Sequence, residues 1–114
     1  KIGGVWRITE LYLDSGAYYT ILHAGFAQSA GLDFRKGIRK NVQVGDGNMI
    51  PIYLHRLPVQ LASESFEATV AFSEKLGVRF NLLGRFEIFE HFKITFQERR
   101  KIVFFEREQK FTAQ

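Results

Sequence analysis

An apolar strand runs directly into an acidic turn over residues 11–17, which read Leu-Tyr-Leu-Asp-Ser-Gly-Ala. Asp and Ser favour turns because their side chains hydrogen-bond nearby backbone, and Gly accepts conformations that other residues avoid. A second apolar run, Ile21 and Leu22, follows closely. A carboxylate at such a junction lies against hydrophobic surface, where it needs hydrogen bonds or a partner. Asp14 is therefore the first candidate functional residue.

The remainder of the chain divides into short pieces with strand character. Apolar runs on either side of a polar turn predict two β-hairpins, one around residues 45–48 and one around residues 97–101. The pieces expected to be strands are rich in β-branched and aromatic residues: Val5–Leu13, Asn41–Val44, Met49–Leu54, Leu57–Leu61, Phe66–Phe72, Phe80–Leu83, Phe92–Phe96 and Ile102–Phe105.

Two stretches predict short helices. His23–Ala30 is rich in Ala and is followed by Gly31, a common residue directly after a helix. Arg85–His91 has room for one or two helical turns. Many short strands with frequent turns and one or two short helices predict a mainly β fold, a small closed β-barrel-like domain.

Length and composition limit the class of protein. The 114 residues suffice for one domain, with a core over 5–105 and a polar tail over 106–114. Hydrophobic residues make up 46%, which excludes a disordered chain. No apolar run approaches the roughly 20 residues of a membrane span. Because the first residue is Lys1, we interpret the chain as processed or as one part of a longer protein.

Several other chemistries are disfavoured. The chain has no Cys, which excludes disulfides and thiolate sites and fits a cytoplasmic origin. His23, His55 and His91 lack metal-ligand spacing, and no Ser lies in a nucleophile elbow. The net charge of +4 reflects basic turns better than a nucleic-acid interface. We expect no metal, no cofactor and no nucleic-acid or membrane partner.

Three motifs in order resemble those of the retropepsin-like aspartic proteases, which include retroviral proteases and related single-domain proteases of cells and retroelements. They are the Asp-Ser-Gly-Ala turn after a strand, the central hairpin with Gly45-Asp46-Gly47 at its tip, and Leu82-Leu83-Gly84-Arg85 before a short helix. The resemblance extends from about Val5 to Phe105. It implies the acid-protease fold and an aspartic endopeptidase activity.

The resemblance also implies a role for each motif residue. Asp14 would be the catalytic carboxylate, and Ser15, Gly16 and Ala17 would complete the active-site loop by bracing it and contacting substrate. The tip of the flap would be formed by Gly45, Asp46 and Gly47. The loop that supports the active site and the dimer would be formed by Leu82, Leu83, Gly84 and Arg85.

One departure concerns the two positions after Ala17. Retroviral members often carry acidic residues there, which bind substrate backbone and can pair with the Arg of the second motif. This chain has Tyr18 and Tyr19 instead. Arg85 therefore lacks that partner, and the outer substrate pockets are expected to differ from those of the retroviral enzymes.

Aspartic-protease chemistry needs two carboxylates that share one proton, one acting as base and the other as acid. The chain contains three Asp residues, and only Asp14 lies in an Asp-Ser-Gly turn; Asp33 and Asp46 do not. A two-fold axis beside Asp14 supplies its twin, so the sequence predicts a homodimer that cleaves peptide or protein substrates. The alternatives are a catalytically silent dimerisation or peptide-binding module and a small basic β-domain that binds nucleic acid.

Overall fold

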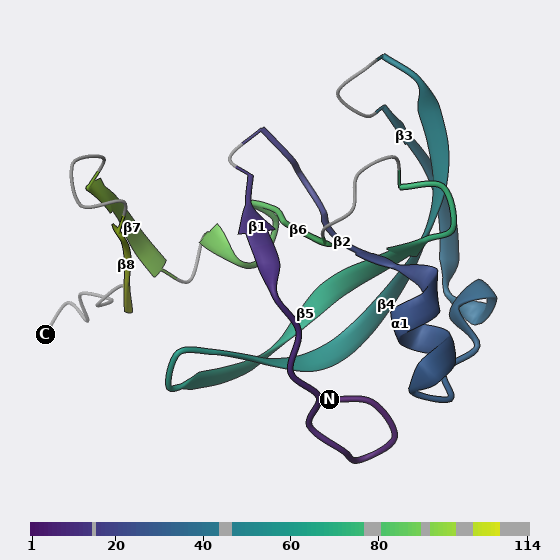
Figure 1. Cartoon of the computed structure of the whole chain (residues 1–114), viewed down its shortest axis with the longest axis horizontal. Coiled ribbons are helices and arrows are strands. Elements are labelled where there is room, and N and C mark those ends of the chain that lie inside the picture. The colour runs from purple at the N-terminus through teal and green to yellow at the C-terminus, as the bar shows by residue number, and fades with distance from the viewer. Residues whose placement is uncertain (15, 44–46, 77–80, 90–91, 98–101, 108–114) are drawn as a thin grey trace, which may run out of the picture.

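The computed structural model describes the backbone of residues 1–14, 16–43, 47–76, 81–89, 92–97 and 102–107, and side chains as far as Phe92. The fold is mainly β, as predicted: a mixed six-stranded sheet curls into a half-barrel and carries one short α-helix (Figure 1). The elements are β1 (Leu11–Leu13), β2 (Thr20–His23), α1 (Ala24–Ser29), η1 (Phe34–Lys36, a 3-10 turn), β3 (Ile38–Gln43), β4 (Met49–Leu61), β5 (Glu64–Ser73), β6 (Asn81–Leu83), β7 (Phe92–Gln97) and β8 (Ile102–Arg107).

The order of strands in the sheet is β1-β6-β2-β5-β4-β3. β6 therefore lies between β1 and β2, although it follows them by about sixty residues of chain. It pairs in parallel with β1, where Leu13 is opposite Leu83, and antiparallel with β2, where Ile21 is opposite Leu82. This insertion brings the loop after β1 against the segment after β6.

β3, β4 and β5 form an antiparallel meander, which confirms the predicted central hairpin. The prediction of two separate strands, Met49–Leu54 and Leu57–Leu61, was wrong because β4 runs unbroken through both. Pro51 is opposite Asn41 of β3, outside the part of β4 that pairs with β5. Pro58 is opposite Glu67 of β5, beyond the end of β3. Each Pro thus lies where β4 has only one neighbour, the position in which a strand tolerates Pro.

The predicted strand Val5–Leu13 is much shorter in the structure, where only Leu11–Leu13 belongs to the sheet. The chain before it forms a tight turn instead. Ile2 and Val5 exchange two backbone hydrogen bonds of 3.0 and 3.1 Å around Gly3 and Gly4, whose φ angles of 59° and 77° are both positive. Positive φ at both central residues is the requirement of a type I′ turn, which Gly meets without strain.

The helix expected over His23–Ala30 is confirmed as α1, with Gly31 following in the left-handed conformation at φ 79°. The helix expected over Arg85–His91 is a turn as far as it is described. One hydrogen bond of helical type joins the Phe89 amide to the Arg85 carbonyl at 3.0 Å. Glu87 has φ 63°, which an α-helix does not accommodate. Residues 90 and 91 lie outside the described part.

Hydrophobic packing occupies both faces of the curled sheet. On one face Phe34, Leu22 and Phe72 pack with α1, and on the other Ile21, Ile50 and Ile52 pack with Leu76. A third, smaller cluster joins Ala68, Leu83 and Ile88 near the end of β6. β7 and β8 form the predicted second hairpin, at the end of the molecule opposite α1 (Figure 1). Among the described residues, no helix has the length and hydrophobicity needed to cross a membrane.

Candidate active-site loop

Asp14 is the first residue after β1 and is half-buried. Its amide donates to the Leu83 carbonyl at 3.1 Å, which continues the β1–β6 pairing by one residue. Its carboxylate oxygen Oδ1 accepts a hydrogen bond from the Gly16 amide at 2.9 Å, and its carbonyl accepts one from the Ala17 amide at 3.1 Å. The turn thus holds the carboxylate through its own backbone, as is usual for Asp in such turns.

The segment after β6 packs against the loop that follows Asp14. The Arg85 amide donates to the Ala17 carbonyl at 3.0 Å, and the Phe86 amide donates to the Tyr18 carbonyl at 2.8 Å. Two motifs separated by more than sixty residues are therefore joined by backbone hydrogen bonds. Leu82 contributes from within β6, opposite Tyr12 and Ile21.

Gly84 occupies the closest approach between the two segments. A Cβ atom at this position would lie 2.3 Å from the Tyr19 carbonyl oxygen and 2.4 Å from its carbon, distances that real Cβ atoms do not show. The Gly84 amide donates to the hydroxyl of buried Thr20 at 3.0 Å. Only Gly fits here without displacement of the backbone.

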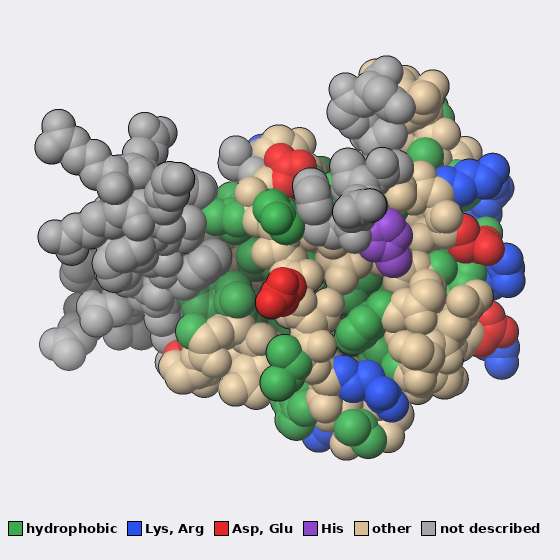
Figure 2. Space-filling model, in the orientation of Figure 1, with side chains coloured by type: hydrophobic (Ala, Val, Ile, Leu, Met, Phe, Trp, Pro, Cys, Tyr) green, Lys and Arg blue, Asp and Glu red, His purple; other side chains and the backbone are tan. Residues whose placement is uncertain are grey.

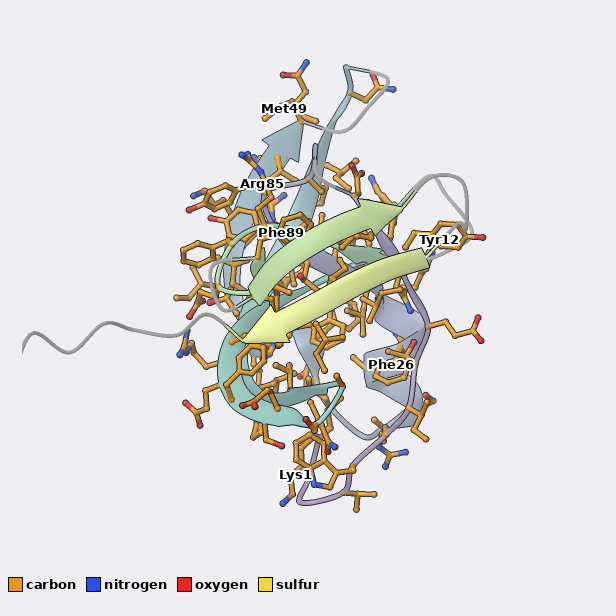
Figure 3. All side chains as sticks on the ribbon, turned by 90° about the vertical axis from the view of Figure 1, so that its left-hand side faces the viewer. Lys1, Tyr12, Phe26, Met49, Arg85 and Phe89 are labelled. Atoms are coloured by element: carbon orange, nitrogen blue, oxygen red, sulfur yellow. The ribbon has the colours of Figure 1, made fainter. Side chains whose placement is uncertain are left out.

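The structure brings Asp14, Gly16 and Ala17 together with the Leu83, Gly84 and Arg85 segment. Ser15, Gly45 and Asp46 lie outside the described residues. Gly47 is described and has φ 87°, a conformation that favours Gly. The β3–β4 hairpin that carries it extends toward the same end of the molecule as the Asp14 loop (Figure 1), with Met49 at its outer end (Figure 3).

Tyr18 and Tyr19 follow Ala17 and form an aromatic cluster with Phe86. Retroviral members often carry acidic residues at these two positions. The Tyr18 and Phe86 rings stack with centroids 5.0 Å apart, and both contact the edge or face of the Tyr19 ring. Lys40 of β3 donates to the Tyr19 hydroxyl at 2.9 Å, a bond that raises the pKa of Lys40. These contacts connect the Asp14 loop to both the second motif and the β3–β4 hairpin.

Glu87 anchors the turn after Gly84 to the sheet. Its carboxylate accepts hydrogen bonds from the Thr69 amide at 3.1 Å and from the Thr69 hydroxyl, and it forms an ion pair with Arg56. Burial alone would raise the pKa of Glu87, but the bonds from Thr69 and Arg56 outweigh it and hold that pKa below its ordinary value.

The sequence assigned no role to Thr20, Asn81 or Glu87, although Asn81 directly precedes the Leu82-Leu83-Gly84-Arg85 motif. The Asn81 amide group bridges two segments, accepting from the His23 amide at 2.8 Å and donating to the Thr9 hydroxyl at 3.0 Å. A small polar residue at the end of an apolar strand can indicate such a role, but the residue that it bonds lies far away in sequence. Pairing of this kind is not visible without the sheet order.

The other candidate ligands have local structural roles. Asp33 accepts from the Arg35 amide and so caps η1, and His55 Nε2 lies 2.7 Å from the Phe34 carbonyl oxygen. Within the described part of the chain, His, Asp and Glu side chains form no group of three that could hold a metal ion.

No family model matches the chain, and neither a curated protein nor a solved structure shows significant similarity to it.

Proposed function

We propose that this chain is one half of a homodimeric aspartic endopeptidase in which each copy supplies Asp14. The observation that carries the proposal is the junction of the two motifs. Asp14 leaves β1 hydrogen-bonded to Leu83, and the following loop is held by Gly84, Arg85 and Phe86. A carboxylate held at a strand end by backbone groups is pre-organised for chemistry on a substrate that lies across the loop.

The choice of Asp14 is supported by the roles of two other carboxylates. Asp33 is engaged in capping η1, and Glu87 is engaged by Thr69 and Arg56. Among the described residues, the Asp14 side chain accepts a hydrogen bond only from the Gly16 amide, at Oδ1, so Oδ2 has no partner among them. A carboxylate with one oxygen fixed and one available suits proton exchange with water.

Peptide hydrolysis in this proposal uses two Asp14 carboxylates across a two-fold axis. Two such groups a few ångströms apart repel each other when both are ionised, so the pair retains one proton. The ionised member takes a proton from water as that water attacks the scissile carbonyl. The protonated member donates to the carbonyl oxygen, and the peptide bond then breaks with transfer of a proton to the leaving amine.

The proposal includes the finer features of the retropepsin type: closure of the half-barrel as in acid proteases, a flap formed by the β3–β4 hairpin, and a substrate bound as an extended strand. The β3–β4 hairpin supports the flap assignment because it extends beside the Asp14 loop and is linked to it through Lys40 and Tyr19. Exposed Val5 is available for contact with a second copy.

The decisive experiment compares Asp14→Asn with the matched variant Asp33→Asn on a library of unstructured peptides. We expect Asp14→Asn to abolish cleavage, with at least about a thousandfold loss of kcat/KM, because Asn neither ionises nor shares a proton. Asp33→Asn is expected to cleave normally. Circular dichroism and thermal melting establish that both variants are folded.

Cleavage by Asp14→Asn at the wild-type rate would contradict the proposal. If the folded wild-type chain cleaves nothing in the library yet binds a statine peptide and dimerises, the silent peptide-binding module is the better description. Salt-sensitive binding to DNA or RNA in place of either result would favour a nucleic-acid role.

A further inference from the structure

A cavity of about 500 Å³ lies between the N-terminal segment and the concave face of the sheet. Its inner walls come from β2, β4, β5 and α1, and its outer wall is the stretch from Lys1 to Leu11. Buried Leu22, Val70 and Phe72 line the interior. The volume falls in the range of about 300–1,000 Å³ that is typical of small-molecule sites. Asp14 does not belong to the lining, so the cavity is separate from the proposed catalytic group.

The N-terminal segment covers the cavity without filling it. Ile2 is buried in the core, and the Lys1 main-chain nitrogen donates to the Pro58 carbonyl at 2.6 Å, so the Gly3–Gly4 turn is held at one edge. Further along, Ile8 is 98% exposed and Trp6 is 45% exposed although both line the cavity. Apolar side chains that are left in water beside an unfilled apolar space favour an apolar occupant.

The charged side chains that line the cavity are basic. Lys1 and Arg7 line it, whereas no Asp or Glu does so among the residues that the structure describes. The Lys1 ammonium lies 5.4 Å from the centre of the Trp6 ring, which places a cation next to the apolar opening. Figure 2 shows basic and hydrophobic side chains together at the lower end of the molecule, where the N-terminal turn lies in Figure 1 and where Figure 3 labels Lys1.

We propose that this cavity binds an unbranched aliphatic carboxylate, with its chain against Leu22, Val70 and Phe72 and its headgroup at Lys1 and Arg7. The apolar walls provide the affinity, because they remove the chain from water. The basic pair provides the selectivity for an anion, since guanidinium and ammonium groups form charge-assisted hydrogen bonds with carboxylates. A cationic headgroup is repelled by the same pair, and a neutral hydroxyl accepts a weaker hydrogen bond than a carboxylate does.

Trp6 offers a direct measurement because it is the chain's one Trp and lines the cavity. The chain is titrated with straight-chain carboxylates from hexanoate to tetradecanoate, each below its micellar concentration, and Trp6 emission and calorimetry are recorded. We expect saturable binding of one molecule per chain. Affinity is expected to rise about fourfold for each added CH₂ group until the cavity is filled, and then to level off.

Two variants test the two halves of the proposal. Val59→Phe introduces bulk into the lining and is expected to weaken decanoate binding at least about tenfold. Val42→Phe, on β3 and outside the lining, is the matched control and is expected to bind normally. Arg7→Glu changes an exposed residue and cancels the net positive charge of the pair, so the preference for decanoate over decyltrimethylammonium is expected to be lost.

Equal binding of decanoate, decanol and decyltrimethylammonium by the wild-type chain would overturn the assignment of the headgroup site. A signal that neither saturates nor responds to Val59→Phe would overturn the cavity as the site. Asp14→Asn is expected to bind decanoate like the wild type, so failure of the protease proposal and failure of this one give different results.

Discussion

Asp14 leaves β1 with its amide bonded to Leu83 and its Oδ1 bonded to the Gly16 amide, so its position depends on backbone geometry around it. Gly84 allows the segment after β6 to approach the loop after Asp14, because the Tyr19 carbonyl occupies the space that any side chain at position 84 would need. A single missing Cβ atom therefore sets the distance between the two motifs.

Gly84→Ala is expected to lower the free energy of unfolding by about 2–3 kcal/mol, because the new methyl group forces the Tyr19 backbone away. Urea unfolding followed by circular dichroism measures the loss. Gly25→Ala is the control: it lies in α1 with nothing within 4 Å of the new methyl, and it should gain up to about 1 kcal/mol. Equal stability of the two variants would refute the tight contact at Gly84.

At the scale of elements, the turn over residues 85–89 is connected to the β4–β5 pair through Glu87, with Arg56 from β4 and Thr69 from β5. The positive φ of Glu87 is a conformation that costs energy for a non-Gly residue, so the surrounding contacts must compensate. The same turn presents Arg85 and Phe86 to the Asp14 loop. The carboxylate of Glu87 thus supports the loop from a distance.

Glu87→Gln is expected to destabilise the chain at pH 7 by about 1–2 kcal/mol and much less in acid. Because the folded-state pKa of Glu87 is lowered, its contribution is fully present above its ordinary pKa and is lost as the pH falls through the folded value. The measurement is the difference in unfolding free energy between wild type and variant at pH 7 and at pH 3.

Glu10→Gln serves as the comparison, since Glu10 is exposed and the same substitution there should leave stability unchanged at both pH values. A wild-type-to-Glu87→Gln difference that stays constant from pH 7 to pH 3 would argue against this role of the carboxylate.

Local pattern was sufficient to predict most elements. Apolar runs around 45–48 and 97–101 predicted both hairpins, and the Ala-rich run before Gly31 predicted α1. The failures have physical causes. The break expected between Leu54 and Leu57 is absent, because β4 pairs with β5 without interruption from Tyr53 to Leu61. Residues 5–10 have strand composition, yet they belong to no strand. Val5 closes the Gly3–Gly4 turn by bonding to Ile2, and the Thr9 hydroxyl accepts from the Asn81 side chain.

The candidate site was less accessible from the sequence. The turn after an apolar strand indicates Asp14, but only the resemblance to a family associates it with Leu82-Leu83-Gly84-Arg85. The partners Thr20 for Gly84 and Thr69 for Glu87 depend on sheet order, which places chain segments together regardless of their spacing. No periodicity in the chain encodes that order.

At the scale of the whole molecule, the proposed chemistry makes activity a property of a pair. Mixing wild type with an equal amount of Asp14→Asn, and allowing subunits to exchange, should reduce peptide cleavage to about half that of the same wild-type amount alone. In a random mixture half of the wild-type copies then lie in mixed dimers, which have only one competent carboxylate. Kinetic assays on mixtures of graded ratio, with sedimentation to follow dimerisation, measure the effect.

Undiminished cleavage at every ratio, under conditions where sedimentation shows mixed dimers, would mean that a single Asp14 suffices. Asp33→Asn mixed in the same way provides the control, because its carboxylate caps η1 and takes no part in the proposed pair.

The place of β6 between β1 and β2 has a consequence for biosynthesis. A nascent chain that has emerged only as far as β5 contains Asp14 but lacks the strand that receives its amide, so the acidic turn has no fixed geometry at that stage. Contacts between such distant segments form late, because the intervening loop must close first. A cell that makes this protein therefore acquires an ordered carboxylate only after β6 has left the ribosome.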